Sequence, residues 1–124
     1  MRPSKRFGKN TLAKPTGSLE EALAALRVEF AASLPERRDS LSNAWRDLTD
    51  RGWDTESQNA AYHAVHSLAG AAETFGFSEI GQAARALNDW LHDLLEANNH
   101  SADQRAVAQQ LYDTLATALA DAVS

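Results

Sequence analysis

The chain has 124 residues, which suffice for one domain with its own hydrophobic core. It contains no cysteine, and this excludes disulfide frameworks, thiolate metal sites and cysteine nucleophiles. No segment approaches the roughly 20 apolar residues of a membrane-spanning helix, and no apolar stretch follows the basic first residues as in a signal peptide, so we expect a cytoplasmic protein.

Charge divides the chain into two parts. Residues 1–17 contain five of the 12 basic residues, no acidic residue, two prolines and two glycines, which predicts a flexible basic N-terminal tail. Seven basic residues then remain against 17 acidic residues, so residues 18–124 carry a net charge of −10. We therefore expect no nucleic-acid partner.

The first two predicted helices follow the tail. Ser18 and Glu21 have the spacing of a capping box, which predicts a helix from residue 18 to about Ser33. Its apolar stripe is Leu19, Leu23, Leu26 and Phe30. Pro35 suits the first turn of a second helix, and Gly52 ends it.

Three further helices are predicted after Gly52. Asp54 or Thr55 caps the third, which ends at Gly76, and Ser78 caps the fourth. Ser101 and Gln104 form a second capping box at the start of the fifth. The connections are short and no segment alternates like a strand, so residues 18–124 predict an all-α domain. We expect an up-and-down antiparallel four-helix bundle with an additional N-terminal helix covering one end.

The third helix displays a histidine away from its apolar face. Ala61, Leu68 and Ala72 share one side of this helix, and His66 projects from the other. Gly70 follows one turn later, where a glycine costs helix stability but leaves room for another molecule. A neutral imidazole is a suitable nucleophile near neutral pH.

These residues resemble the phosphoacceptor motif of the histidine-containing phosphotransfer (HPt) domains of multistep phosphorelays. That motif is a histidine, any residue, leucine, often lysine, glycine, two small residues and, a turn later, an apolar residue and glycine. Here it reads His66-Ser-Leu-Ala-Gly-Ala-Ala-Glu-Thr-Phe-Gly76, and the resemblance covers about residues 18–123. Ala69 stands where many members have lysine, which removes a cation that could neutralise a phosphoryl group.

The resemblance implies a phosphorelay intermediate. His66 is then the phosphoacceptor, and a receiver-domain aspartate is the donor. The partner-binding surface is expected to comprise Tyr62, His63, Ala69, Gly70 and Glu73. Gln82 on the next helix is the candidate for orienting the second ring nitrogen of His66.

The implied partners are response-regulator receiver domains and a hybrid histidine kinase. The chain has no glycine-rich phosphate loop, so we expect no autonomous kinase activity. We expect it to bind no cofactor or metal itself, because the receiver brings the divalent metal, and to be a monomer without membrane insertion.

Two alternatives remain open at this stage. An HPt-like adaptor could dock receivers or kinases without transferring phosphate, and Ala69 makes this more plausible. A metal-binding bundle could use His63, His66 and Glu73, although the two histidines lack the spacing of four with an acid between them.

Overall fold

The computed structural model describes residues 15–97 and 100–123, with side chains from residue 18 onward. These residues form four α-helices and no strand. The helices are α2 (Pro15–Asp50), α3 (Thr55–Thr74), α4 (Ser78–Ala97) and α5 (Ala102–Val123). Residues 1–14 of the predicted tail lie outside the described residues, whereas residues 15–17 belong to α2.

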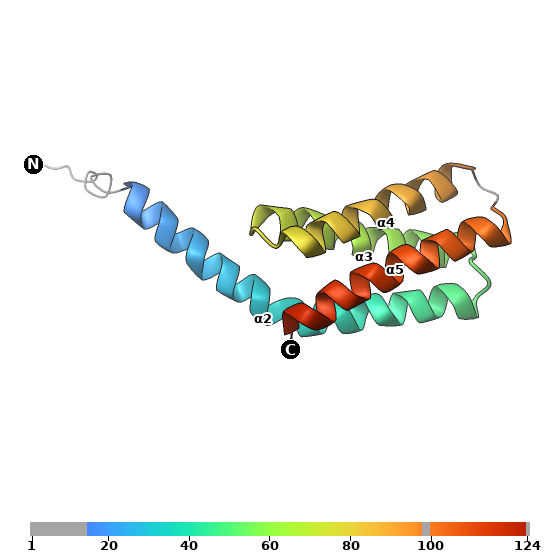
Figure 1. Cartoon of the computed structure of the whole chain (residues 1–124), viewed down its shortest axis with the longest axis horizontal. Helices are drawn as coiled ribbons and strands as arrows, with labels where there is room; N and C mark the ends of the chain where they lie inside the picture. Colours follow the sequence, from blue (N-terminus) through green and yellow to red (C-terminus); the bar gives the residue numbers. More distant parts are fainter. Residues whose placement is uncertain (1–14, 98–99, 124) are drawn as a thin grey trace, which may run out of the picture.

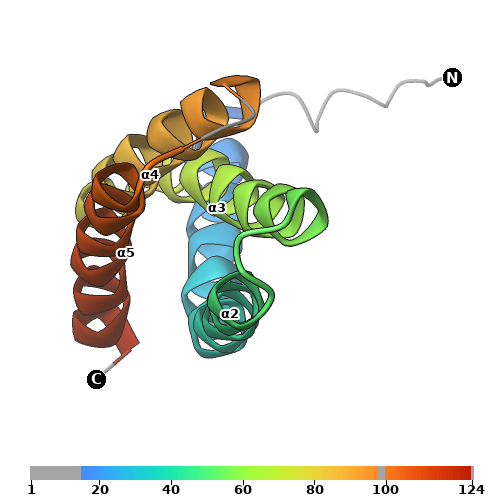
Figure 2. The same ribbon diagram turned by 90° about the vertical axis from the view of Figure 1, so that its right-hand side faces the viewer.

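The second part of α2 and the three later helices form an up-and-down bundle. Neighbouring pairs are α2 with α3, α3 with α4, α4 with α5, and α5 with α2, so the last helix closes the ring onto the first. Figure 1 shows these helices running side by side, and Figure 2 shows the arrangement from one end. The predicted antiparallel four-helix bundle is therefore confirmed.

The additional N-terminal helix was predicted wrongly. Residues 15–50 form one continuous helix with Pro35 inside it, and the helix already begins at Pro15 rather than after a cap at Ser18. The first part of α2 does not cover the end of the bundle, because it projects away from the other helices (Figure 1). Leu19 and Leu23 are accordingly exposed, by 59% and 45%.

Pro35 bends α2 without ending it. Proline lacks the N–H for the helical hydrogen bond and crowds the preceding turn, which usually kinks a helix. Figure 1 shows the change of direction between the projecting part and the part in the bundle. In the same turn the Ser33 hydroxyl donates to the Phe30 carbonyl at 2.7 Å, and Arg37 Nε donates to Ser33 Oγ at 2.9 Å.

The turns between the bundle helices follow the predicted signals. Gly52 ends α2 at φ 67°, and Gly76 follows α3 at φ 81°, which are left-handed conformations that favour glycine. The Ser101–Gln104 capping box is confirmed, since each backbone N–H donates to the other residue's side chain, at 2.7 and 3.1 Å. Ser78 is not a cap: it is the first residue of α4, and the Gly81 N–H donates to the Phe77 carbonyl.

The core is a layer of aliphatic side chains between the four helices, with tryptophans at its edge. Trp45 stacks on Tyr112 with ring centroids 4.4 Å apart and donates its indole N–H to Gln109. The large side chains with the least exposure are Leu34, Leu48, Val65, Leu87, Leu91, Leu115 and Leu119. This core holds α3 and α4 against each other and so fixes the position of His66.

Candidate functional site

The candidate site lies on α3, whose start is fixed by Asp54. The Asp54 carboxylate accepts the Ser57 backbone N–H at 2.8 Å, which makes Asp54 the N-cap. Hydrogen bonds from Ser57 lower the pKa of Asp54, and Arg51, 3.0 Å away, acts in the same direction. The cap therefore stays ionised at neutral pH and favours the helix that carries His66.

His66 is exposed on α3 beside α4. Its Nδ1 atom lies 3.1 Å from Asn88 Oδ1 on α4. The Asn88 amide nitrogen donates to Asp89 at 3.2 Å, so the amide oxygen is the atom that faces the ring. His66 Nδ1 is then the protonated nitrogen, and Nε2 keeps its lone pair.

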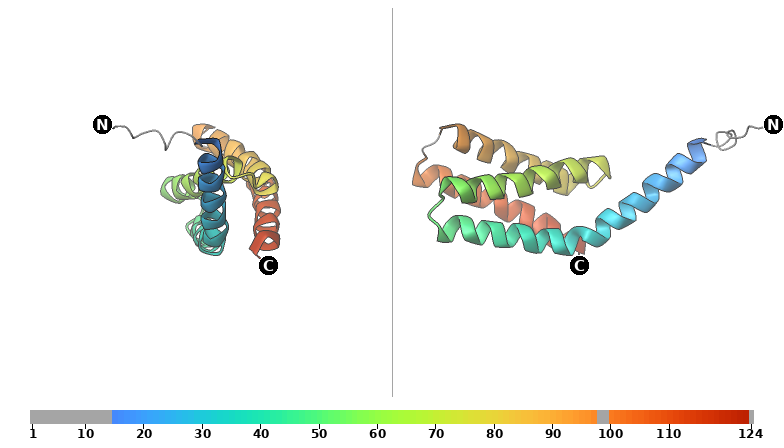
Figure 3. Two further views of the ribbon diagram at one scale, coloured as in Figure 1. Left: turned by 90° about the vertical axis from the view of Figure 1, so that its left-hand side faces the viewer. Right: turned by 180° about the vertical axis from the view of Figure 1, so that it is seen from behind.

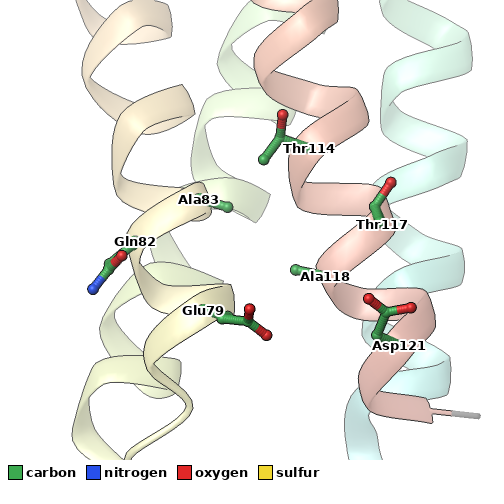
Figure 4. Close-up of a pocket in the computed structure, with 7 residues that line it drawn as sticks. All are labelled: Glu79, Gln82, Ala83, Thr114, Thr117, Ala118 and Asp121. Carbon is green, nitrogen blue, oxygen red and sulfur yellow. The ribbon is translucent and has the colours of Figure 1, made fainter.

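The ring-orienting residue is thus Asn88, and the prediction of Gln82 was wrong. Gln82 instead lies near the α3–α4 turn, where it lines a small pocket with Glu73, Gly76 and Ser78. It is also at the edge of a cavity of about 540 Å³ between α4 and α5 (Figure 4). His66 and Asn88 stand at nearly equal distances in sequence from Gly76, whereas Gln82 is much nearer to this turn. Residues at equal distances from a short antiparallel turn face each other, and this signal could have identified Asn88 from the sequence.

Tyr62 is the centre of a small ring cluster next to His66. Its ring centroid lies 5.6 Å from those of both His63 and His66, and 6.0 Å from that of His92 on α4. Tyr62 is half-buried, whereas the three imidazoles are exposed. The structure therefore brings Tyr62, His63 and His66 together as predicted and adds His92 to the same surface.

Gly70 is exposed one turn after His66. A Cβ atom built on Gly70 would meet nothing within 4 Å, so the protein itself has no packing need for glycine there. The space above this position is open to an approaching molecule.

Ala69 was predicted to be part of the exposed surface, and this is wrong. Its exposed fraction is only 6%, because α3 turns this residue toward the core with Val65, Leu68 and Ala72. Ala69 was assigned to the surface from its place in the phosphoacceptor motif, whereas its spacing of four from Val65 and three from Ala72 is that of a core-facing residue.

Glu73 is exposed two turns after His66 and is paired with Arg85 of α4. Both carboxylate oxygens accept from this guanidinium, with Arg85 Nε 2.7 Å from Glu73 Oε2. The Arg85 hydrogen bond lowers the pKa of Glu73. Arg85 was not predicted, yet it is the only lysine or arginine on α3 and α4.

Neither a metal site nor a membrane span emerges from residues 15–97 and 100–123. In these ranges, no group of three or more His, Asp or Glu residues is arranged to hold a metal ion. Over the same ranges, no helix is long and apolar enough to cross a membrane.

A family model described as the Hpt domain matches residues 25–123. The chain belongs to the Hpt domain family. Comparison with curated proteins and with solved structures found no match.

The Hpt match covers the whole bundle and includes His66. Hpt domains take part in histidine phosphotransfer in phosphorelays and interact with receiver domains. The match begins at residue 25, so the first part of α2, with Leu19 and Leu23, precedes the Hpt region.

Proposed function

We propose that this Hpt protein accepts a phosphoryl group on His66 Nε2 from a receiver aspartate and passes it to another receiver. The observation that carries the proposal is the 3.1 Å contact between His66 Nδ1 and Asn88 Oδ1. It holds an exposed imidazole by one nitrogen and leaves the other nitrogen as the nucleophile.

The transfer is a displacement at phosphorus. The lone pair of His66 Nε2 forms the N–P bond while the bond from phosphorus to the aspartyl carboxylate breaks, and the carboxylate leaves with the electron pair. The ring becomes a cation that keeps its proton on Nδ1, and the Asn88 oxygen stabilises it through a charge-assisted hydrogen bond. Attack by a second receiver carboxylate reverses these changes and frees His66.

In this proposal the receiver supplies the divalent metal for phosphoryl transfer. We propose that the divalent metal is bound by the receiver and that no cofactor is bound by this chain. Phosphoryl transfer depends on alignment and on neutralising the phosphoryl oxygens, so a rigid histidine presented to a metal-bearing partner suffices. We place this exchange in the cytoplasm, with a hybrid histidine kinase upstream.

The proposed receiver-binding surface surrounds His66. It comprises Tyr62, His63, Gly70 and Glu73 from α3, without the buried Ala69. The open space above Gly70 allows the receiver backbone to approach the ring closely.

Arg85 is proposed to replace the lysine that many Hpt domains carry at the position of Ala69. It lies three residues before Asn88, and residues with this spacing share one face of a helix. Its partner Glu73 is also on the His66 side, so the guanidinium already spans from α4 to α3. Because Arg85 lowers the pKa of Glu73, the pair is not released by protonation at neutral pH; a phosphoryl group must compete for the guanidinium.

The same Ala69 favours a second candidate function, a docking adaptor that does not transfer phosphate. The two functions separate in a two-step experiment. The protein is first incubated with a phosphorylated receiver and repurified, and then mixed with an unphosphorylated receiver. Label that reaches the second receiver supports the relay; binding of receivers without label on the protein supports the adaptor.

A further inference from the structure

The projecting part of α2 carries an apolar stripe that remains open to solvent. Leu19, Leu23 and Leu26 are exposed by 59%, 45% and 43%. Their spacings of four and three place them on one side of the helix, in line with Phe30, which is only 4% exposed where the bundle begins. The right-hand view of Figure 3 shows that the start of α2 extends away from α3, α4 and α5. Only near its junction with the bundle does this part touch α3, where Arg27 reaches the Phe75 carbonyl.

The projecting part of α2 belongs to one continuous helix but gains little stability from packing, because its apolar face is open. Isolated helices of about 12–15 residues are marginal in water, and helices in proteins gain most of their stability by packing an apolar face. The stripe is therefore suited to pairing with another helix.

We propose that the stripe pairs with the same stripe of a second copy of this chain, in antiparallel orientation. Pairing centred on Leu23 sets Leu19 against Leu26 of the second copy, and Leu26 against its Leu19. The six leucine side chains then cover one another and lose water contact.

The charges on this segment select the antiparallel orientation. Arg27 is the only basic residue between Ser18 and Glu36, and Glu20 lies on the same side of the stripe. Antiparallel pairing brings Glu20 of each copy toward Arg27 of the other, whereas parallel pairing places these two flanks on opposite sides of the dimer and brings no such opposite charges together. Arg27 Nε donates to the Phe75 carbonyl at 2.9 Å, and the remaining N–H groups of the guanidinium can bind the Glu20 carboxylate of the second copy.

The expected dimer is weak and depends on concentration. One helix from each copy buries less area than the roughly 1,200–2,000 Å² of stable protein interfaces. The sequence alone favours a monomer, and the open stripe is the structural reason to propose self-association.

Sedimentation velocity of the full chain, from low micromolar to submillimolar concentration, tests the proposal. We expect the wild type to shift from monomer to dimer, and Leu23→Glu to weaken the dimer by at least about tenfold. Val28→Glu is the matched control, since Val28 is 68% exposed but lies off the stripe, and it should dimerise like the wild type. Circular dichroism checks that each variant keeps its helices.

Swapping the charges of Glu20 and Arg27 tests the antiparallel orientation of the dimer. Glu20→Arg and Arg27→Glu should each weaken the dimer, and the double variant should restore it. A wild type that stays monomeric throughout, equal losses in the Leu23→Glu and Val28→Glu variants, or a double variant without recovery would each overturn the proposal.

Discussion

His66 Nδ1 and Asn88 Oδ1 lie 3.1 Å apart and connect α3 to α4 at the proposed phosphorylation site. The contact defines which ring nitrogen carries the proton. In the proposed function, we therefore expect the reactivity of His66 to depend on a residue of the next helix.

Replacing Asn88 should slow phosphorylation without unfolding the bundle. Asn88→Ala removes the acceptor for the Nδ1 proton, and we expect the initial rate of label transfer from a phosphorylated receiver to fall about tenfold, the effect of one hydrogen bond to a charged group. Asn88→Asp keeps an acceptor and should retain most of the rate. Equal losses in both variants would mean that Asn88 acts through packing alone.

Arg85 variants should change the lifetime of the phosphorylated protein. Arg85→Gln removes the cation proposed to bind the phosphoryl group, so the isolated phosphoprotein should lose its label several-fold faster. Glu73→Gln frees Arg85 from its partner and should slow the loss. The decay of label at constant pH measures both effects.

The control for Arg85 is Arg51→Gln, which removes an exposed arginine paired with Asp54 and Glu56 at the start of α3. Its phosphoprotein should decay like the wild type. If Arg85→Gln decays no faster than this control while the wild type is labelled normally, the role of Arg85 is refuted and that of His66 is not.

Bulky side chains at Gly70 should block the partner and spare the fold. Gly70→Ala removes a helix-destabilising glycine where a Cβ meets nothing, so the melting temperature should stay or rise. Gly70→Phe should also fold, but it should slow transfer strongly because the ring fills the approach to His66. Normal transfer by the Gly70→Phe variant would show that receivers do not come close at this position.

Stability should fall on mild acidification because of His100. Burial lowers the pKa of His100, and nearby Arg105, whose Nε lies 2.9 Å from the ring, lowers it further. The unfolded chain then binds this proton more readily than the folded one, so stability is lost as the pH falls through the usual histidine range near 6.5. His100→Gln should flatten the dependence of melting temperature on pH between about 7 and 5. If melting temperature depends on pH in His100→Gln as it does in the wild type, groups other than His100 cause the loss of stability.

The sequence predicts the bundle helices well because their signals are local. Gly52, Gly76 and the Ser101–Gln104 box act within a few residues, and each one ends or begins a helix as expected. Pro35 shows the limit of such signals. Proline at the start of a helix and proline in a bent helix look alike in sequence, and the choice depends on how α2 packs.

The site is predicted less completely because it depends on pairing between helices. His66 and Gly70 are visible from one helix alone, whereas Asn88 and Arg85 become relevant only once the register of α3 against α4 is known. Val65, Leu68, Ala69 and Ala72 have the spacing i, i+3, i+4 and i+7 of a core-facing helix side, so the burial of Ala69 could have been read from the sequence.

The most direct measurement is acid-labile, alkali-stable phosphate on the protein after incubation with phosphorylated receiver domains, compared between the wild type and His66→Gln. We expect label on the wild type alone, with similar helicity and melting temperature in both proteins because His66 is exposed. Equal label on a folded His66→Gln variant, or no label on a folded wild type with any receiver, would contradict this expectation.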